Sequence, residues 1–315
     1  LDPPPINTAS GSASFIGGGS SNTASAKESV VGGGCSNAAA AACSTIVGGN
    51  NSGIDSGGES GFIGGGAENC ISSGKNTTIG GGCQNTVSAC AGTVAGGICN
   101  KVTSIQIKHG LSDSDTNTIT ANSCHGSIIG GCGNKVCNDF GTVAGGKGNC
   151  AGAACSYVGG GESNDIAAGA HTTVAGGCGN FNCNEASFVG GGRGNALCAT
   201  TYGISVLVGG FGNTITGSAS GSIIVGGTHN CGTGTGSFIG GGVGNQTTDI
   251  HTIIVGGKDN RSSQDFTIVV GGQDNCSTGN YSVIVGGHSN CSSGNCSFIG
   301  GGCANDAYAV GSVVV

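Results

Sequence analysis

The stretch Ser282-Val283-Ile284-Val285-Gly286-Gly287-His288-Ser289-Asn290 decides the fold, because it recurs with small changes throughout the chain. The pattern occurs in 18 copies, whose last position lies at residues 22, 37, 52, 69, 85, 100, 134, 149, 164, 180, 195, 213, 230, 245, 260, 275, 290 and 305. That position is Asn in every copy except Ser52, and the usual spacing is 15 residues, doubling once between Asn100 and Asn134. A fixed period of this size predicts a solenoid, in which each repeat is one coil that buries its apolar face against its neighbours.

Each column of the repeat has one chemical character. Six positions before the Asn, every copy carries Ile, Val or Leu, which suits an inward position on a β-strand. Both turn glycines are present in every copy, which predicts a positive φ or a lack of room for a Cβ atom. The column Asn is expected to turn inward, where its amide bonds turn backbone and the Asn of the next coil. The sequence therefore predicts an all-β fold, a parallel β-solenoid of about 19 coils with a 15-residue repeat.

The chain is expected to form a single solenoid domain over residues 15–315. Residues 1–14 are predicted to be an extended segment, because they contain Pro3-Pro4-Pro5, followed by a half-coil. Residues 103–126 are predicted to form one enlarged coil. Residues 312–315 match Ser282 to Val285, which predicts an open C-terminal strand. Since these two ends are complementary, completion of a coil head to tail by the next copy is one predicted mode of assembly.

Composition narrows the class of protein. The 71 Gly lack the every-third-residue order of collagen, and a net charge of -7 makes nucleic-acid binding unexpected. No apolar run approaches the length that spans a bilayer, so membrane insertion is not expected. The chain does not begin with Met and shows no signal peptide, which suggests a processed chain or a fragment. Nineteen Cys without a C-x-x-C pair favour disulfides over zinc, and hence an extracellular, cell-surface or virion-surface location.

The outward positions of the conserved strand, seven and five before the Asn, vary together. Phe goes with Gly, as in Phe62/Gly64; Val or Ile goes with Val; and Thr goes with Ala. A solvated face has no evident reason to keep a constant volume, so this strand is expected to be buried on both sides, against another copy of the chain. The residues predicted to form this assembly face are Phe15, Phe62, Phe188, Phe238, Phe298, Val313, Val314 and Val315.

The cysteines follow the columns and are predicted to staple the coils. Residues five apart are candidates for disulfides within one coil: Cys132 with Cys137, Cys150 with Cys155, Cys178 with Cys183, and Cys291 with Cys296. Cys276 and Cys291 are candidates for a bridge between neighbouring coils, because stacked Cα atoms lie within disulfide range. An odd number of cysteines leaves at least one thiol free or paired between chains.

Other candidate sites carry weaker signals. Asp113, Asp115 and Asn117 resemble the start of a calcium loop that lacks its turn Gly and closing Glu, so a solvated loop is the preferred interpretation. Of eight sequons, Asn280 and Asn295 are the glycan candidates, since four others fall on the column Asn. The six His occupy no common column and lie beside no evident nucleophile. No catalytic triad, carboxylate pair, phosphate loop or cofactor site is recognised, and no enzymatic activity is expected.

The repeat, as in Ser282-Val283-Ile284-Val285-Gly286-Gly287 and Asn22-Thr23-Ala24-Ser25, resembles the head repeats of trimeric autotransporter adhesins. This resemblance implies a left-handed parallel β-roll, three of which pack side by side as a surface adhesin. We expect a structural, non-enzymatic subunit of an extracellular or virion-surface fibre, whose partners are copies of itself in a homotrimer or a head-to-tail filament. The alternatives are an adhesin head that binds a surface ligand and an ice-binding solenoid. The latter requires a regular Thr array, which Phe, Val and Ile interrupt.

Overall fold

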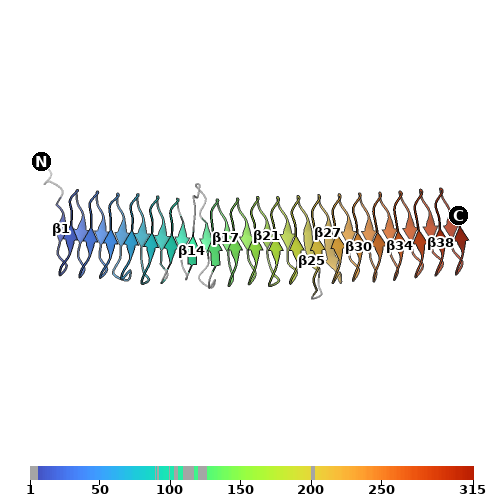
Figure 1. Ribbon diagram of the computed structural model, residues 1–315, viewed down its shortest axis with the longest axis horizontal. Coiled ribbons are helices and arrows are strands. Elements are labelled where there is room, and N and C mark those ends of the chain that lie inside the picture. Colours follow the sequence, from blue (N-terminus) through green and yellow to red (C-terminus); the bar gives the residue numbers. More distant parts are fainter. Residues whose placement is uncertain are drawn as a thin grey trace. The chain divides into compact units, whose positions relative to one another are not determined.

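The computed structural model describes residues 6–88, 90, 92–98, 100–102, 106–108, 117–119, 126–199 and 203–315. These residues form short parallel strands and no helix, stacked as a β-solenoid of about 19 turns with a spacing of about 15 residues. The predicted fold class is thus confirmed. The chain divides into two compact units, Leu1–Cys155 and Ser156–Val315, and each is built from successive turns stacked on one another (Figure 1).

Every turn contributes one strand to each of two parallel sheets, which we call sheet A (odd-numbered strands) and sheet B (even-numbered strands). In unit 1, sheet A contains β1 (Thr8–Ala9), β3 (Thr23–Ala24), β5 (Ala38–Ala39), β7 (Gly53–Ile54), β9 (Cys70–Ile71), β11 (Thr86–Val87), β13 (Lys101–Val102), β15 (Thr118–Ile119), β17 (Lys135–Val136) and β19 (Cys150–Ala151). Sheet B of unit 1 contains β2 (Phe15–Ile16), β4 (Val30–Val31), β6 (Thr45–Ile46), β8 (Phe62–Ile63), β10 (Thr78–Ile79), β12 (Thr93–Val94), β14 (Gln106–Lys108), β16 (Gly126–Ile128) and β18 (Thr142–Val143).

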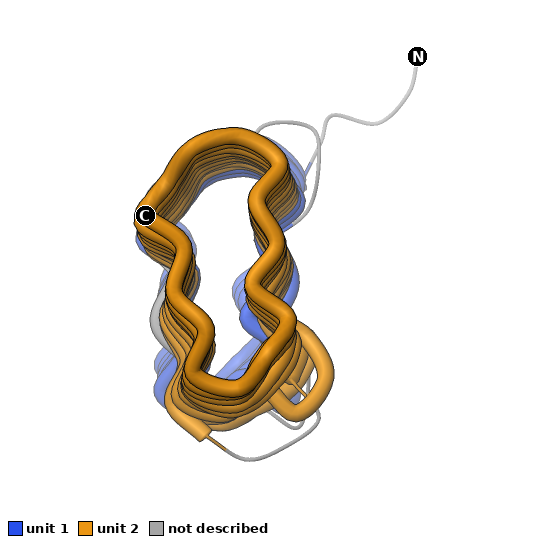
Figure 2. Tube along the Cα trace, turned by 90° about the vertical axis from the view of Figure 1, so that its right-hand side faces the viewer, with its two compact units in different colours: residues 1–155 blue, residues 156–315 orange. Residues whose placement is uncertain are grey.

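Unit 2 repeats this arrangement. Its sheet A contains β21 (Asp165–Ile166), β23 (Phe181–Asn182), β25 (Ala196–Ala199), β27 (Thr214–Gly217), β29 (Cys231–Gly232), β31 (Gln246–Thr247), β33 (Arg261–Ser262), β35 (Cys276–Ser277), β37 (Cys291–Ser292) and β39 (Asp306–Ala307). Its sheet B contains β20 (Tyr157–Val158), β22 (Thr173–Val174), β24 (Phe188–Val189), β26 (Val206–Leu207), β28 (Ile223–Ile224), β30 (Phe238–Ile239), β32 (Ile253–Ile254), β34 (Ile268–Val269), β36 (Val283–Ile284), β38 (Phe298–Ile299) and β40 (Val313–Val314). Viewed along the stack, successive turns of unit 2 follow nearly the same outline (Figure 2).

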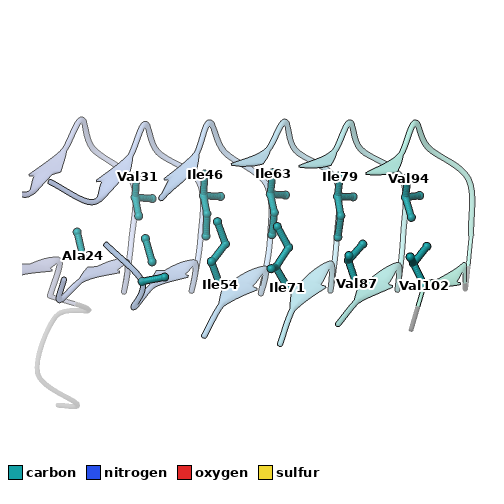
Figure 3. Packing of buried hydrophobic residues seen from close by; sticks show 12 residues of the cluster. Ala24, Val31, Ile46, Ile54, Ile63, Ile71, Ile79, Val87, Val94 and Val102 are labelled. Atoms are coloured by element: carbon teal, nitrogen blue, oxygen red, sulfur yellow. The ribbon is translucent and has the colours of Figure 1, made fainter. Parts of the chain in front are cut away.

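The core of unit 1 lies between the two sheets and takes one aliphatic side chain from most strands, because alternate residues of a strand point to opposite faces. Sheet B contributes residues such as Val31, Ile46 and Ile63, and sheet A contributes residues such as Ile54 and Ile71. These side chains are fully buried and point toward one another between the two rows of strands (Figure 3). The inward Ile/Val/Leu column that the repeat predicts is therefore confirmed.

The core of unit 2 becomes partly polar toward the C-terminus. Sheet B still supplies aliphatic side chains such as Ile254 and Ile284, but the inward residues of β33, β35 and β37 in sheet A are serines. These hydroxyls pair with the Ser or Thr five residues on: Ser262 with Thr267, Ser277 with Ser282 and Ser292 with Ser297, each with a 2.6 Å oxygen–oxygen distance. Since a buried hydroxyl is costly unless it is hydrogen-bonded, these pairs allow the core to accept polar residues.

The column Asn forms a buried ladder, as predicted. The backbone N–H of Asn290 donates to Oδ1 of Asn275 at 3.0 Å, and Nδ2 of Asn290 donates to the carbonyl oxygens of Gly286 and Gly302 at 3.0 Å each. Each amide thus links its own turn to both neighbouring coils. Ser52 continues the ladder with its hydroxyl, which accepts the backbone N–H of Asn69 at 3.3 Å.

Residues 103–126, predicted as one enlarged coil, contain strands that continue both sheets. β14 pairs with β12 and β16, and β15 pairs with β13 and β17. Asn117 is buried and takes a ladder place 17 residues before Asn134, whose backbone N–H donates to its Oδ1 at 2.9 Å. The doubled spacing between Asn100 and Asn134 therefore holds a further ladder Asn, which the sequence pattern missed.

The two turn glycines have different reasons for being glycine. Gly287 has φ +92°, and a Cβ added there would overlap the carbonyl oxygen of Gly302 and approach Nδ2 of Asn290. The prediction of positive φ and lack of space is confirmed for this column. Gly286 has no such φ, and a Cβ added there would meet nothing within 4 Å. Five other glycines of this column, Gly18, Gly65, Gly160, Gly191 and Gly301, have φ between +148° and +159°, which favours glycine at those places. At Gly286 itself, neither φ nor a contact within the described residues requires glycine.

Candidate functional site

The outer face of sheet B from β26 to β40, in unit 2, is a continuous apolar surface, which we call the B face. It consists of the side chains seven and five positions before each ladder Asn. Over eight successive strands, from β26 to β40, these positions hold only Val, Ile, Phe and Gly. The side chains five positions before the Asn are exposed to a similar degree, with Val225 at 43%, Val255 at 49%, Val270 at 42% and Val285 at 43% exposed, while Ile253, Ile268 and Val283, seven positions before it, are half-buried. A contiguous exposed apolar surface on a folded chain is typical of an interaction site.

The predicted assembly residues mostly lie on outward positions of sheet B. Phe188, Phe238, Phe298, Val313 and Val315 belong to unit 2, and Phe15 and Phe62 occupy the same columns of unit 1. Val314 differs, because its side chain packs against the core cluster that contains Ile299. The assembly-face assignment is therefore wrong for Val314, since alternation along β40 turns this residue inward between Val313 and Val315.

The pairing of a large outward residue with a small one two residues later, as in Phe62/Gly64, has a cause within the chain. A Cβ added at Gly64 would overlap the carbonyl oxygen of Gly80 in the next coil, and a Cβ added at Gly240 would overlap that of Val255. The Phe ring of the same strand lies further away, with Cε1 of Phe62 3.4 Å from the Cβ added at Gly64. The backbone of the neighbouring coil therefore requires glycine at these positions, and the pairing of Phe with Gly does not require a partner chain. What remains unexplained within the chain is the unbroken apolar character of the B face.

The structure contains one disulfide among its described residues, between Cys183 and Cys198, whose Cα atoms are 5.0 Å apart. These residues lie 15 positions apart, so the bond joins neighbouring coils. The predicted pairing of Cys183 with Cys178 is therefore wrong. Residues five apart fall in different columns of one coil, whereas residues one repeat apart lie side by side in register.

Cys276 and Cys291 are brought together as predicted, but as thiols. They are register partners in β35 and β37, so their side chains lie beside each other on neighbouring coils. Burial raises the pKa of both thiols, and for Cys291 the neighbouring Cys276 raises the pKa further. Cys291 thus faces Cys276 and not Cys296, its other predicted partner, which is an exposed thiol.

In the other predicted cysteine pairs, the two members occupy different columns of the repeat. The backbone of Cys132 forms a parallel β-bridge with that of Lys147. The backbone N–H of Cys137 donates to the carbonyl oxygen of Ala151. Cys150 is paired in register with Lys135, while Cys155 is exposed at a turn with φ +52°. Their positions follow the same rule, since each lies beside the residue one coil away.

The glycan candidates lie on the turn after sheet A. Asn295 is exposed, and its Oδ1 accepts the backbone N–H of Asn280 at 3.1 Å. Asn280 is partly exposed, with its own Oδ1 buried and without a partner. By contrast, the sequons that begin at Asn245, Asn260, Asn275 and Asn290 have Nδ2 buried and hydrogen-bonded in the ladder. Glycosylation of Asn280 and Asn295 stays a prediction.

The calcium candidate is only partly placed. Asp113 and Asp115 lie outside the described residues. Oδ1 of Asn117 accepts a ladder hydrogen bond, and its Nδ2 donates to the carbonyl oxygen of Gly131 at 2.6 Å. Asn117 is thus engaged in the ladder. Within the part of the chain that the structure describes, no three His, Cys, Asp or Glu side chains are grouped to hold a metal ion.

One cluster was missed by the sequence analysis, which placed no nucleophile beside a His. Sγ of Cys303 lies 3.8 Å from Nδ1 of His288, and Nε2 of His288 lies 3.6 Å from Oδ2 of Asp274. His288 and Cys303 lie opposite each other on neighbouring coils, two positions before their ladder Asn. Their separation of 15 residues is the signal that could have found this pair.

Other His side chains join aromatic residues at the turns. The rings of His251 and Phe266 are stacked with centroids 5.1 Å apart, and Phe266 and Tyr281 are stacked at the same distance. His229 contacts Phe211 edge to face at 5.2 Å. These residues too lie about one repeat apart, so stacking of coils creates aromatic rows that are not adjacent in the sequence.

A scan against protein-family models and a search of curated proteins each gave no match. In the described part of the chain, no helix has the length and apolar character needed to cross a membrane.

Proposed function

We propose that this chain is a structural, non-enzymatic subunit of an extracellular or virion-surface fibre, and that copies of it associate through the B face of unit 2. The observation that carries this proposal is the run of eight strands with only Val, Ile, Phe and Gly outward. Burial of apolar surface is the main favourable term in protein association. Charged side chains of the same coils, such as Lys258, Asp259 and Arg261, lie in other columns and would not be desolvated by this contact.

Three turn glycines of unit 2, Gly256, Gly271 and Gly286, support the same surface. These glycines directly follow the outward Val of each strand, and an added Cβ at Gly256, Gly271 or Gly286 would point into open space. A glycine without a conformational or steric reason inside its own chain suits a place where another backbone approaches closely. A partner that packs on the B face would meet this column at its border.

The proposed location has separate support. The Cys183–Cys198 disulfide is of the kind that persists in oxidising surroundings such as the cell exterior. Head-to-tail completion of a coil, expected from the chain ends, stays a prediction.

An adhesin head is the second candidate. In unit 2, only one of the two outer sheet faces is continuously apolar, because sheet A carries outward residues such as Gln246, Arg261 and Asp306. A chain with one apolar face can bury it completely in a closed oligomer, which agrees with the trimer implied by the resemblance to autotransporter head repeats.

The test replaces Val255 and Val270 by Lys, since both side chains are exposed and a change there should not disturb the core. We expect the parent chain to be oligomeric by light scattering and the double variant to be monomeric, because lysines on the B face would have to be desolvated. The matched control is Gln246→Lys with Gln264→Lys, which adds the same charge to exposed positions of the same two coils outside the B face.

Electron microscopy of the parent distinguishes the two candidates. Long filaments support the fibre, whereas discrete rods with the mass of a trimer support the adhesin head. A parent chain that is monomeric at high concentration, or a control that dissociates like the Val255/Val270 variant, would contradict assembly through the B face.

A further inference from the structure

Asp274, His288 and Cys303 form a continuous row of chemically reactive groups across three successive coils of unit 2. The imidazole lies between the other two, with Nδ1 facing the Cys303 thiol at 3.8 Å and Nε2 facing the Asp274 carboxylate at 3.6 Å. All three side chains reach solvent, and Cys303 is exposed. A thiol beside an imidazole whose far nitrogen faces a carboxylate is the arrangement that activates a sulfur nucleophile.

The fold holds this row in place through the coil register. His288 and Cys303 are bridge partners, and the backbone N–H of Ala304 donates to the carbonyl oxygen of His288 at 2.9 Å. Asp274 sits one position later in its coil, with φ +55°, and Nε2 of Gln273 donates to its Oδ2 at 3.0 Å. Oδ2 of Asp274 therefore accepts the hydrogen bond of Gln273 and also faces Nε2 of His288. With Nε2 facing Asp274, Nδ1 is the ring nitrogen that faces Cys303.

We propose that Cys303 is a reactive thiol that undergoes exchange with an organic disulfide, with His288 as its proton acceptor and Asp274 as a positioning residue. Nδ1 of His288 takes the proton from Cys303, and the thiolate attacks one sulfur of the disulfide. The Cys303–sulfur bond forms as the sulfur–sulfur bond of the reagent breaks. The departing thiolate takes the proton from His288, so one disulfide and one thiol are present before and after the exchange.

Two exposed thiols of unit 1, Cys35 and Cys43, lack this arrangement. Cys35 occupies the same column in unit 1, but its bridge partners are Ser20 and Asn50, and its sulfur lies 3.6 Å from Oγ of Ser36. The thiol of Cys43 donates to the carboxylate of Glu28, which raises the pKa of Cys43. Cys35 is therefore a matched reference, since it is exposed at the same place in the coil without a neighbouring base.

The coil that precedes Asp274 carries its own pair of charged side chains. In the preceding coil, Lys258 and Asp259 lie 3.9 Å apart and pair with each other. The acid–base groups that contact the imidazole of His288 are thus Asp274 and Cys303.

The experiment treats the reduced full chain with a substoichiometric amount of an aromatic disulfide reagent and measures, peptide by peptide, which cysteine is modified first. At pH 6.5 we expect Cys303 to react about tenfold faster than Cys35, because a positioned base matters most where free thiols are protonated. His288→Gln should remove this advantage and leave the rate at Cys35 unchanged. The matched control is His229→Gln, which changes a histidine that contacts Phe211.

The role of Asp274 is tested by the pH profile. Asp274→Asn should slow exchange at Cys303 about threefold at pH 6.5, a modest share of what general-base catalysis contributes, and less at pH 9. Asp274→Glu should restore most of the rate, whereas a structural defect would slow the reaction equally at both pH values. Equal rates at Cys303 and Cys35, or an undiminished rate in His288→Gln, would overturn the proposal.

Discussion

The two outer faces of unit 2 are built on the same coils but have opposite chemistry. In the coil that follows Asn260, sheet A turns Arg261 outward, and sheet B turns Ile268 and Val270 outward. Along the stack, sheet A presents Gln246, Arg261, paired thiols and Asp306, while the B face remains apolar over eight strands.

The interior does not require this difference. Each coil is held by its ladder Asn, its aliphatic sheet B residue and its turn glycines, all of which point inward or lie in the turn. Unit 1 shows that the outward column can be polar, because Thr45, Thr78 and Thr93 occupy it on strands of the same sheet. Since the coil folds with either kind of residue, the interior does not account for the apolar B face, and the proposed association between copies would account for it.

The largest expected effect on both faces comes from the Asn ladder, because the ladder joins the coils on which both faces are built. Asn260→Ala removes Nδ2, which donates to the carbonyl oxygens of Gly256 and Gly272 at 3.1 and 2.9 Å, and Oδ1, which accepts from Asn275 at 3.0 Å. Leaving these buried groups unpaired should lower the free energy of unfolding by about 3 kcal/mol or more, measured by denaturant titration. Because both faces lie on the same coils, unfolding of these coils should remove both faces at the same denaturant concentration.

A conservative control for the ladder exists in the chain itself. Ser52 fills a ladder place with a single hydroxyl, so Asn260→Ser should retain an acceptor for Asn275 and cost less than the Ala variant. If the Ala variant unfolds at the parent's denaturant concentration, the ladder is not what holds the coils together.

The turn glycines give the next largest effect and separate the interior from the surface. Gly287→Ala should cost about 2 kcal/mol, because the added methyl group overlaps the next coil and φ is +92°. Gly286→Ala should change the unfolding free energy by less than about 0.5 kcal/mol, since the methyl group meets open space. If the B face is an interface, Gly286→Ala should still weaken association in light scattering. If Gly287→Ala and Gly286→Ala were equally stable, the Gly287 column would not be an interior requirement that the Gly286 column lacks.

The fold was predictable from the sequence because its constraints are inward and periodic. The Asn, the aliphatic column and the Gly287 column each repeat every coil, so one chain supplies many examples of the same local requirement. Asn117 was missed because the residues around it depart from the pattern, although the ladder it joins depends on the amide alone.

The sites were less predictable because they arise between coils. Cys183 bonds to Cys198 and His288 contacts Cys303, in both cases one repeat away, whereas most of the predicted cysteine pairs lie five residues apart in the same coil. The pair Phe62/Gly64 shows the opposite error, because the carbonyl oxygen of Gly80 in the next coil already requires glycine at Gly64, while the pairing was interpreted as a sign of a partner. Both errors have one cause, since sequence columns give register but not the direction in which an exposed side chain turns.

The smallest expected effect concerns two partly exposed thiols on sheet A, those of Cys276 and Cys291. Burial raises the pKa of both in the folded chain, so the folded state holds these protons more tightly than the unfolded state. Their contribution to stability is thus complete below the ordinary thiol pKa, about 8.5, and is lost as the pH rises through the raised folded values. The effect should be small, because both thiols are partly exposed.

Denaturant midpoints at pH 7.5 and pH 10 under reducing conditions measure this contribution. The parent should lose more stability than Cys276→Ser/Cys291→Ser, which has no thiols to titrate at this place. Cys35→Ser/Cys155→Ser serves as the control, because it removes two exposed thiols and should respond to pH like the parent. Should the parent and the Cys276/Cys291 variant lose stability equally, the thiol pair would be solvated like the rest of sheet A. The contrast between the two faces would then extend to every outward position of these coils.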